Sequence, residues 1–353
     1  MARFHAQRLE HPAPLGRGTM PALVAVEGPV PEPGPGEVLV EVHACAVCRT
    51  DLQLVEGDLP ARRLPVVPGH QVVGTVVAVG PADPSEPDPR AAPAVGDRVG
   101  LAWIAGTCGR CRFCTSGREN LCEQARFTGW DRDGGYATHV TAAAAFTHRL
   151  PDGFGDLDAA PLLCGGVIGY RSLKVAGMGP ARVGARLGLF GFGASATCVI
   201  QVAVHWGLEV HVCTRSEREQ QAARELGAAW AGGYDERPPV PLDAAITFAP
   251  AGAVVAAAVR SLDRGGVVAV NAIHLDRLPE MPYDDLWWER SIRSVANVTR
   301  EDVREFLQLA AEIPVRTRTE VLPLVEAGTA LRRLAAGDVS GSFVLQVGPG
   351  PTG

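Results

Sequence analysis

Short apolar runs alternate with segments of helical apolar spacing through the centre of the chain. Strands are expected at 186–190, 209–213, 241–250 and 265–273, and helices at 196–206, 217–226 and 251–262. Two of these helices end at a glycine, Gly207 and Gly227, which is a common helix stop. Strands and helices that alternate in this order predict a doubly wound parallel sheet over about residues 165–297.

The turn after the first of these strands has a glycine pattern typical of dinucleotide binding. Gly191, Gly193 and Ala196 form G-x-G-x-x-A between a strand and a helix. The first glycine permits a tight turn, and the second lets backbone amides approach a pyrophosphate at the helix N-terminus. The third small residue allows the helix to pack closely on the strand. Because the chain has 41 glycines, the flanking strand and helix carry this prediction.

The end of the second strand indicates which dinucleotide is bound. An acidic residue there would hold the ribose hydroxyls of NAD, but this chain has Thr214, Arg215 and Ser216, followed by Arg218. Hydroxyls and guanidiniums suit a 2′-phosphate, so NADP(H) is expected in preference to NAD(H). The alternative is that these residues are solvated polar groups at a helix start.

Four cysteines between residues 108 and 122 form a compact metal-binding motif. Their spacing is C-x2-C-x2-C-x7-C, at Cys108, Cys111, Cys114 and Cys122. Short loops between four thiolates let one segment surround a tetrahedral zinc ion with no coordination position left for substrate, which indicates a structural site. An iron–sulfur cluster or four unrelated buried cysteines are the alternatives. Three arginines of the loop can offset the surplus thiolate charge: Arg110, Arg112 and Arg118.

Composition limits the class of protein further. The 353 residues exceed the usual size of a single core, so two domains are expected. The net charge of −6 gives no general attraction to nucleic acid or anionic lipid. The stretch Leu187–Leu208 is uncharged, but it is interrupted by glycines and contains Gln201 and His205, which argues against a membrane span. Nine cysteines, an odd and clustered set, and an N-terminus without a secretory pattern favour a cytoplasmic protein.

Two further motifs are ambiguous by themselves. Cys45 and Cys48 form a C-x2-C pair at the end of the strand expected over 37–47, where a thioredoxin-like motif is one interpretation. His70 stands in PGHQVVG ahead of an apolar run, and a lone histidine is usually a surface residue or a satisfied core residue.

Taken together, the motifs resemble the zinc-dependent medium-chain alcohol dehydrogenases. The matching segments run from GEVLVEVHACAVCRTDL through PGHQVVGTVVAVG, VGDRVG, the cysteine loop, GGYATHV and PLLCGGVIGY to the nucleotide turn. The resemblance covers nearly the whole chain in order. It implies a Rossmann domain at 165–297 and a discontinuous, mostly β GroES-like catalytic domain at 1–164 and 298–353, with the active site between them. The strand expected near 340–347 would then return to the first domain's sheet.

The resemblance also implies roles for particular residues. The catalytic zinc ligands fall on Cys48, His70 and Cys164, which gives two Zn²⁺ per chain with the cysteine loop. Three protein ligands leave one coordination position for a substrate oxygen. The remaining residues with an implied role are Thr50 as proton shuttle, Asp51 as the carboxylate that orients His70, and Arg49 at the cofactor pyrophosphate.

Two positions depart from the family pattern. Gln71 follows the zinc histidine where the family usually has Glu, and the lost negative charge is expected to make the zinc more electrophilic. Gln53 stands where many relatives have the histidine that ends the proton relay, so we expect the last transfer to go directly to water.

The expected function is oxidation of alcohols or reduction of aldehydes by hydride exchange with NADP(H). An apolar pocket would favour aliphatic or aromatic substrates; the residues considered for it are Trp103 and Ile104, and less strongly Trp130, Leu54 and Ile273.

The proline-rich segment from Pro81 is expected to be a surface loop. A homodimer or homotetramer is implied by the resemblance. A zinc-free quinone or enoyl reductase and a non-catalytic cofactor-binding regulator remain as alternatives.

Overall fold

The chain folds into two compact units. The structure, a computed structural model, describes residues 3–15, 23–83, 92–313 and 315–348. Unit 1 comprises Met1–Cys164, Thr299–Ala311 and Thr317–Gly353, and unit 2 comprises Gly165–Val298 and Glu312–Arg316. Residues 84–91, eight of the 18 residues of the proline-rich segment predicted to be a surface loop, lie outside the described residues.

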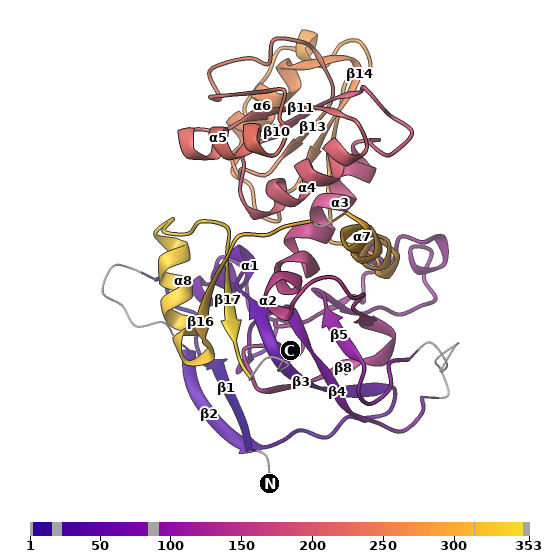
Figure 1. Ribbon diagram of the computed structural model, residues 1–353, viewed down its shortest axis with the longest axis vertical. Helices are drawn as coiled ribbons and strands as arrows, with labels where there is room; N and C mark the ends of the chain where they lie inside the picture. Colours follow the sequence, from indigo (N-terminus) through magenta and orange to yellow (C-terminus); the bar gives the residue numbers. More distant parts are fainter. Residues whose placement is uncertain (1–2, 16–22, 84–91, 314, 349–353) are drawn as a thin grey trace. The chain divides into compact units, whose positions relative to one another are not determined.

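Unit 2 contains one six-stranded sheet in which every neighbouring pair is parallel (Figure 1). Its strands are β10 (Arg186–Phe190), β11 (Glu209–Cys213), β12 (Trp230–Gly232), β13 (Leu242–Thr247), β14 (Leu262–Val270) and β15 (Ser291–Ser294). Its helices are α3 (Gly165–Val175), α4 (Ala194–His205), α5 (Glu217–Glu225), α6 (Gly252–Arg260) and the short 3-10 helix η6 (Tyr283–Asp285). The strand order β12-β11-β10-β13-β14-β15 is doubly wound, which confirms the predicted sheet.

The two strands that sequence patterning did not predict lie at the ends of this sheet. β12 has only three residues, and β15 reads Ser-Ile-Arg-Ser, with one apolar side chain in four. An end strand has a neighbour on one side only, so it needs less apolar surface than the central strands. The predicted central strands have nearly continuous burial, as β11 does with four buried residues in five.

The uncharged stretch from Leu187 to Leu208 is divided between β10, the glycine turn and α4. No helix in the described part of the chain is long and apolar enough to cross a membrane. Gln201 in α4 faces a polar partner: its side-chain amide bonds the backbone oxygen and nitrogen of Arg316, each at 2.9 Å. The apolar composition of residues 187–208 is therefore explained by a strand of the parallel sheet and the helix that follows it.

Unit 1 is mostly β. Its strands are β1 (Arg3–Leu9), β2 (Leu23–Pro29), β3 (Glu37–Ala46), β4 (Gln71–Val79), β5 (Arg98–Leu101), β6 (Ile104–Gly106), β7 (Arg126–Phe127), β8 (His139–Ala143), β9 (Thr147–Arg149), β16 (Thr319–Pro323) and β17 (Ser342–Gln346). Its helices are α1 (Arg49–Glu56), α2 (Asp156–Ala159), α7 (Arg300–Glu312) and α8 (Ala327–Ala335), with 3-10 helices η2 (Cys114–Ser116), η3 (Glu119–Leu121), η4 (Ala144–Phe146), η5 (Ala160–Leu163) and η7 (Leu324–Glu326).

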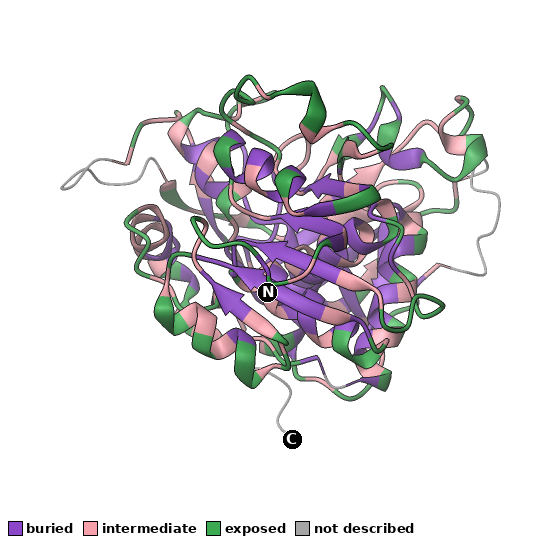
Figure 2. Ribbon diagram, turned by 90° about the horizontal axis from the view of Figure 1, so that it is seen from above, coloured by how far each residue is buried: buried purple, intermediate pink, exposed green. Residues whose placement is uncertain are grey.

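The seven-stranded sheet of unit 1 is centred on β3 and β4. β3 pairs antiparallel with β4, β8 and β17, so the last described strand lies in the same sheet as β3 and β4. Figure 2 shows buried strands and more exposed loops, and β3 itself has seven buried residues in ten. The β3–β4 register sets Ala46 opposite Gln71 at one end and Val38 opposite Val79 at the other. Cys48 follows the Ala46 end of this pair, and His70 precedes it.

Candidate metal centres

Three residues from separate segments of unit 1 bring their ligand atoms together. The Cys48 and Cys164 sulfurs and a ring nitrogen of His70 all lie within 4.8 Å of one another. Cys48 lies between β3 and α1, and His70 directly precedes β4, so the β3–β4 register brings them close. Cys164 follows η5, whose four residues are all buried and which contacts both strands. The sheet thus assembles a site from residues more than ninety positions apart in the chain.

The geometry of His70 fits a metal ligand. Its side chain is 1% exposed, and its Nδ1 lies 2.9 Å from Asp51 Oδ1. Its Nε2 is buried and has no hydrogen-bond partner among the described residues. A buried imidazole nitrogen without a partner is costly, but a metal ion would satisfy it. When Nδ1 donates to Asp51, the neutral ring keeps its lone pair on Nε2, the form that binds zinc.

The charges of this site favour a cation. Burial lowers the pKa of His70, but the Asp51 carboxylate and the Cys48 sulfur raise it to about 10. A hydrogen bond from Cys164 and the charge of a protonated His70 hold the pKa of the Cys48 thiol well below its usual value. The raised pKa of His70 shows that the groups around its ring are negative, which favours a cation at this place.

Asp51 organises the site through four hydrogen bonds. Besides His70, its carboxylate accepts the backbone N–H groups of Cys48 at 2.9 Å and Gly69 at 3.3 Å. The fourth donor is the hydroxyl of Tyr136, at 3.3 Å from Oδ2. Tyr136 is fully buried at 0% exposure. The structure therefore adds Tyr136 to the residues that orient His70.

Sequence analysis quoted GGYATHV without assigning Tyr136 a role. The signal lies in the glycines around it, because Gly134 and Gly135 pack against the segment that carries His70. A Cβ on Gly134 would lie 2.0 Å from the Gly69 backbone oxygen, and a Cβ on Gly69 would lie 2.4 Å from the Tyr136 ring. Gly69 also has φ +94°, a conformation that favours glycine. These three glycines permit the close approach that brings the tyrosine hydroxyl to Asp51.

The other predicted residues of this site lie on or beside α1 and β4. The Thr50 hydroxyl is 3.8 Å from the Cys48 sulfur. Gln53 is half-buried three positions after Thr50, hence near it on the same helix face, and Arg49 is exposed at the first position of α1. Gln71 is buried as the first residue of β4. Cys45 does not join the ligand group formed by Cys48, and its sulfur lies close to Gly69 and Gly135 instead.

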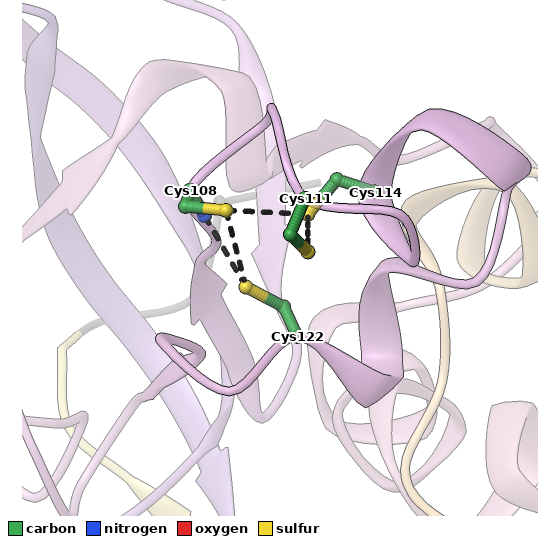
Figure 3. A group of neighbouring side chains, drawn as sticks. All are labelled: Cys108, Cys111, Cys114 and Cys122. Atoms are coloured by element: carbon green, nitrogen blue, oxygen red, sulfur yellow. Dashed lines mark hydrogen bonds between the residues drawn. The ribbon is translucent and has the colours of Figure 1, made fainter.

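The four cysteines of the predicted zinc loop converge in a second cluster (Figure 3). Their sulfurs are separated by 3.5 Å for Cys111 and Cys114, 3.6 Å for Cys108 and Cys122, and 3.9 Å for Cys108 and Cys114. Four sulfurs at about 2.3 Å from a tetrahedral zinc ion stand about 3.8 Å apart. Hydrogen bonds from the backbone of Arg110 and Cys111 lower the pKa of Cys108 to about 6, which favours the thiolate.

The arginines of the loop have different surroundings. Arg112 and Arg118 lie over the ring of Phe113, at 4.6 and 5.5 Å from Cζ to the ring centroid, and all three arginines are exposed. The loop is instead fastened by Glu119, whose carboxylate accepts the backbone N–H of Arg300 at 2.8 Å and its guanidinium at 2.7 Å. Arg300 begins α7, so this ion pair joins the cysteine loop to that helix.

Aromatic side chains lie beside His70. Trp103 is 6.1 Å from the His70 ring, centroid to centroid, and packs on Phe127 at 4.6 Å and Trp130 at 5.8 Å. These three aromatic residues are half-buried, whereas Ile104 and Leu54 are core residues at 0% and 2% exposure. Ile273 belongs to unit 2, where it is 52% exposed.

The nucleotide turn of unit 2 has the expected local geometry. Gly191 has φ +94°, and Gly193 is the N-cap of α4. A Cβ at Gly193 would meet no described atom within 4 Å, so packing within the protein does not explain this glycine, whereas space for a ligand does. Ala196 is fully buried in α4. This turn therefore fits a pyrophosphate at the helix N-terminus.

The end of β11 contains an acid that sequence analysis did not consider. The Thr214 hydroxyl donates to the carboxylate of Glu219 at 2.5 Å, and Ser216 caps α5 by accepting the backbone N–H of Glu219. Arg215 and Arg218 are exposed, and neither guanidinium has a hydrogen bond or ion pair within the described part of the chain. The hydroxyls thus have structural partners, while the two cations are available to a ligand.

A doubly wound sheet with a dinucleotide turn, joined in one chain to a β unit with cysteine and histidine clusters, defines the class of two-domain dehydrogenases. The family described as "Alcohol dehydrogenase GroES-like domain" matches residues 34–152, and that described as "Zinc-binding dehydrogenase" matches residues 196–312. The chain is 49% identical over 351 residues to a probable alcohol dehydrogenase, AdhA, of Mycobacterium tuberculosis, with 98% of each chain covered.

Two further comparisons agree. An alcohol dehydrogenase of Geobacillus stearothermophilus is 34% identical over 323 residues, covering 88% of this chain and 92% of the relative. The crystal structure of AibC aligns with a TM-score of 0.85 at 28% identity, covering 98% of this chain and 96% of that one. The chain therefore belongs to the medium-chain dehydrogenase/reductase family of zinc-binding alcohol dehydrogenases. The resemblance and fold class inferred from the sequence are confirmed.

The Tyr136 contact yields a first prediction. Tyr136→Phe removes one donor to Asp51 and leaves the ring packing in place. Mutation of a residue that orients a metal ligand typically changes metal affinity by about 10- to 100-fold. We therefore expect zinc to leave the His70 site about tenfold faster than in the parent protein. The release rate is measured with a chromogenic chelator.

The matched control is Tyr283→Phe, which removes a hydroxyl from an exposed tyrosine in unit 2. A cobalt-substituted Tyr136→Phe protein should also show an altered visible absorption band, which reports ligand geometry. Zinc release and a cobalt spectrum identical to those of the parent would show that Tyr136 acts only in packing.

Proposed function

We propose that this alcohol dehydrogenase is zinc-dependent and exchanges a hydride between NADP(H) and a primary or secondary alcohol or its carbonyl product. The observation that carries the proposal is the convergence of Cys48, His70 and Cys164 with a buried, unpartnered His70 Nε2. A zinc-free quinone or enoyl reductase would have no use for this ligand set. Neither would a non-catalytic regulator need the oriented His70–Asp51 pair.

The chain's residues would divide the chemistry as follows. Zinc held by the two thiolates and His70 would supply a Lewis acid with one open coordination position. Asp51 keeps the His70 ring in one tautomer and orientation. The Thr50 hydroxyl, close to Cys48, would take the proton of the substrate hydroxyl and pass it on. Gln53 does not titrate near neutrality, so the proton would leave to water.

The aromatic cluster supports an apolar substrate. Trp103, Phe127 and Trp130 present ring surface beside His70, and no charged side chain belongs to the cluster itself. Arg62 packs over Trp130 at 3.8 Å but is paired with Asp131. Aliphatic and aromatic alcohols or aldehydes would gain contact with these rings, whereas a sugar would lose hydrogen bonds to water.

We infer two zinc ions per chain, with different roles. Cys48→Ala should lower the zinc content from two ions to one and abolish aldehyde reduction, because a ligand of the open site is lost. Cys111→Ala should also leave one zinc ion. It should lower the thermal stability of the protein, while the protein that stays folded should still reduce aldehydes. Elemental analysis and NADPH oxidation measure these outcomes. Full turnover by Cys48→Ala, or an unchanged zinc count in either variant, would contradict the assignment.

The proposed preference for NADP(H) rests on Arg215 and Arg218. Both guanidiniums are exposed at the end of β11 and the start of α5, where the adenosine ribose lies in dinucleotide folds. Glu219 opposes the preference, because its carboxylate lies beside Thr214 in the same place. Glu217 is a second acid in the same turn, so the preference rests on contact and not on net charge: Glu219 is bound to Thr214, whereas both guanidiniums have no described partner and would contact a 2′-phosphate directly.

Arg215→Gln should raise KM for NADPH about tenfold and change KM for NADH little, because only NADPH carries the 2′-phosphate. Glu219→Gln should lower KM for NADPH, because it removes a negative charge near the place of the 2′-phosphate. Arg260→Gln, at the exposed end of α6, is the charge-matched control. Equal effects of Arg215→Gln on both cofactors, or a parent enzyme that favours NADH, would overturn the NADP(H) assignment.

We also propose that the protein forms a dimer through the end strand β15. One side of β15 pairs with β14, and the other ends the sheet. Tyr283, Trp287 and Trp288, just before β15, are 68%, 49% and 48% exposed, an unusual grouping for a surface. A two-fold axis at this edge would continue the sheet and cover the aromatic side chains.

Ser294→Glu places a charge on the exposed end of β15. In a two-fold pair along β15 this charge would be placed against the partner strand, so the dimer should weaken about tenfold or more, as seen by light scattering over a concentration series. Ser116→Glu, exposed in unit 1, is the control. An oligomer unaffected by Ser294→Glu would place the interface elsewhere.

A further inference from the structure

Cys164, the third residue of the candidate zinc site, comes from a helical segment that is fastened to the sheet of unit 1. Cys48 and His70 adjoin β3 and β4, whereas Cys164 follows η5 and is the last residue of unit 1. Its place in unit 1 therefore depends on the residues before it, which form α2 and η5. We call these residues, 156–163, the ligand segment.

A buried carboxylate fastens the start of the ligand segment. The Asp156 side chain is 6% exposed, and each of its oxygens has a partner from a different strand. Oδ2 lies 2.8 Å from Nδ1 of His43 in β3, and Oδ1 accepts the Nε–H of Arg98 in β5 at 2.7 Å. Burial raises the pKa of Asp156, but the bonds to His43 and Arg98 outweigh burial and leave the pKa below its usual value. Asp156 is therefore a carboxylate at neutral pH, held on two strands at once.

Arg98 also binds the loop that leads into the ligand segment. Its guanidinium donates to the backbone oxygens of Pro151 at 3.3 Å and Phe154 at 2.8 Å. Its Cζ lies 5.9 Å from the centre of the Phe154 ring. One side chain of β5 thus holds both this loop and the first residue of α2.

A glycine of the same strand accommodates the end of the ligand segment. Gly100 lies two positions after Arg98 in β5, so both residues face the same side of the sheet. A Cβ on Gly100 would lie 2.6 Å from Cδ2 of Leu163, the residue before Cys164. Leu163 is 1% exposed, so its side chain has little room to move away. β5 thus contacts the ligand segment near both of its ends.

The ligand segment is helical throughout, so a displacement at its start reaches Cys164. The backbone N–H of Ala160 donates to the backbone oxygen of Asp156, which joins α2 to η5 without a break. Four residues of α-helix and four of 3-10 helix span about 14 Å. A zinc–sulfur distance stays within about 0.2 Å of its ordinary value. A small rotation of the segment about Asp156 would therefore take the Cys164 sulfur out of range.

We propose that Asp156, through its contacts with two strands, is a positioning residue that sets the Cys164 sulfur at the distance a zinc ion requires. It acts through the backbone of the ligand segment and is not a catalytic residue. The site would then depend on two buried carboxylates, because Asp51 orients the imidazole of His70 and Asp156 places a thiolate. The inference rests on the proposed function for the zinc ion, whereas the fastening of the ligand segment does not.

The first test uses the zinc-loaded, full-length protein and Asp156→Asn, which keeps the size of the side chain and removes its charge. Since residues that position a metal ligand change metal affinity by about 10- to 100-fold, zinc should leave the Cys164 site about tenfold faster than in the parent. A chromogenic chelator follows the release, and Cys48→Ala identifies the phase that belongs to this site. Release from the cysteine loop is the internal reference and should not change.

Hydrogen–deuterium exchange supplies a second readout that needs no metal at the site. The amides of residues 156–164 should exchange about tenfold faster in Asp156→Asn, because the carboxylate no longer holds the segment. The amides of β4 should keep their rates. A parent protein that holds zinc only in the cysteine loop would contradict the proposed function, whereas the exchange rates would still test the fastening of the segment.

Two controls separate the position of Asp156 from charge and from overall stability. Asp158→Asn makes the same change at an exposed position of α2. Glu37→Gln breaks a half-buried ion pair with Arg132 at the end of β3 away from Cys48. Both variants should release zinc at the rate of the parent protein.

His43→Leu replaces Asp156→Asn if that variant does not fold, because it leaves the pair of Asp156 and Arg98 in place. The loss of one hydrogen bond should speed zinc release about three- to fivefold. Two results would overturn the proposal. Zinc release and exchange of residues 156–164 at the parent's rates in the folded variant would show that Cys164 is placed without the carboxylate. An equal acceleration by Glu37→Gln would show that any loss of stability in unit 1 has this effect.

Discussion

The buried carboxylate of Asp51 is the constraint on which the candidate active site depends. It accepts hydrogen bonds from the Cys48 and Gly69 backbone, from His70 and from Tyr136, so it fixes the positions of two ligand-bearing segments at once. A carboxylate at 3% exposure is stable in this place only because its donors surround it. The same contacts leave His70 Nε2 without a partner. A cation at this place would satisfy that nitrogen.

The sheet of unit 1 explains how distant residues reach this carboxylate. β3 and β4 run antiparallel, so the residues after one and before the other meet at the same end. The opposite end of the pair opens on a cavity lined by His148. Between the two lies a core of valine and leucine side chains that are almost fully buried. The ion pair of Glu119 and Arg300 in turn joins the cysteine loop to α7.

Sequence patterning predicted the features whose signal is local. The central strands of unit 2 and the glycine turn were recognisable because each depends on neighbouring residues. The ends of that sheet were not, because β12 is too short and β15 too polar to produce a pattern. Tyr136 and Glu219 were missed for a different reason. Tyr136 acts through its contact with Asp51, and Glu219 acts through its contact with Thr214. Only the contact between Tyr136 and Asp51 joins residues that are far apart in the sequence.

The ligand set was inferred in two ways. The spacing of four cysteines within fifteen residues indicates zinc directly, whereas nothing local relates His70 to Cys164. Resemblance to a family supplied that relation, and the tertiary fold then placed the three ligand atoms within reach of a single ion. A cavity lined by His148 had no sequence signal, since its wall is assembled from five separate elements, β3, β4, η4, β9 and α7.

X-ray absorption at the zinc edge tests the central claim most directly. A closed site of four sulfurs and an open site of two sulfurs, one imidazole and one oxygen average to about three sulfurs at about 2.3 Å and one nitrogen or oxygen at about 2.0 to 2.1 Å per zinc. We predict this average for the parent protein. For a protein in which the four-cysteine loop holds no zinc, we predict the ligands of the open site alone, which are two sulfurs, one imidazole and one oxygen. A spectrum with four sulfurs and no imidazole would contradict the account.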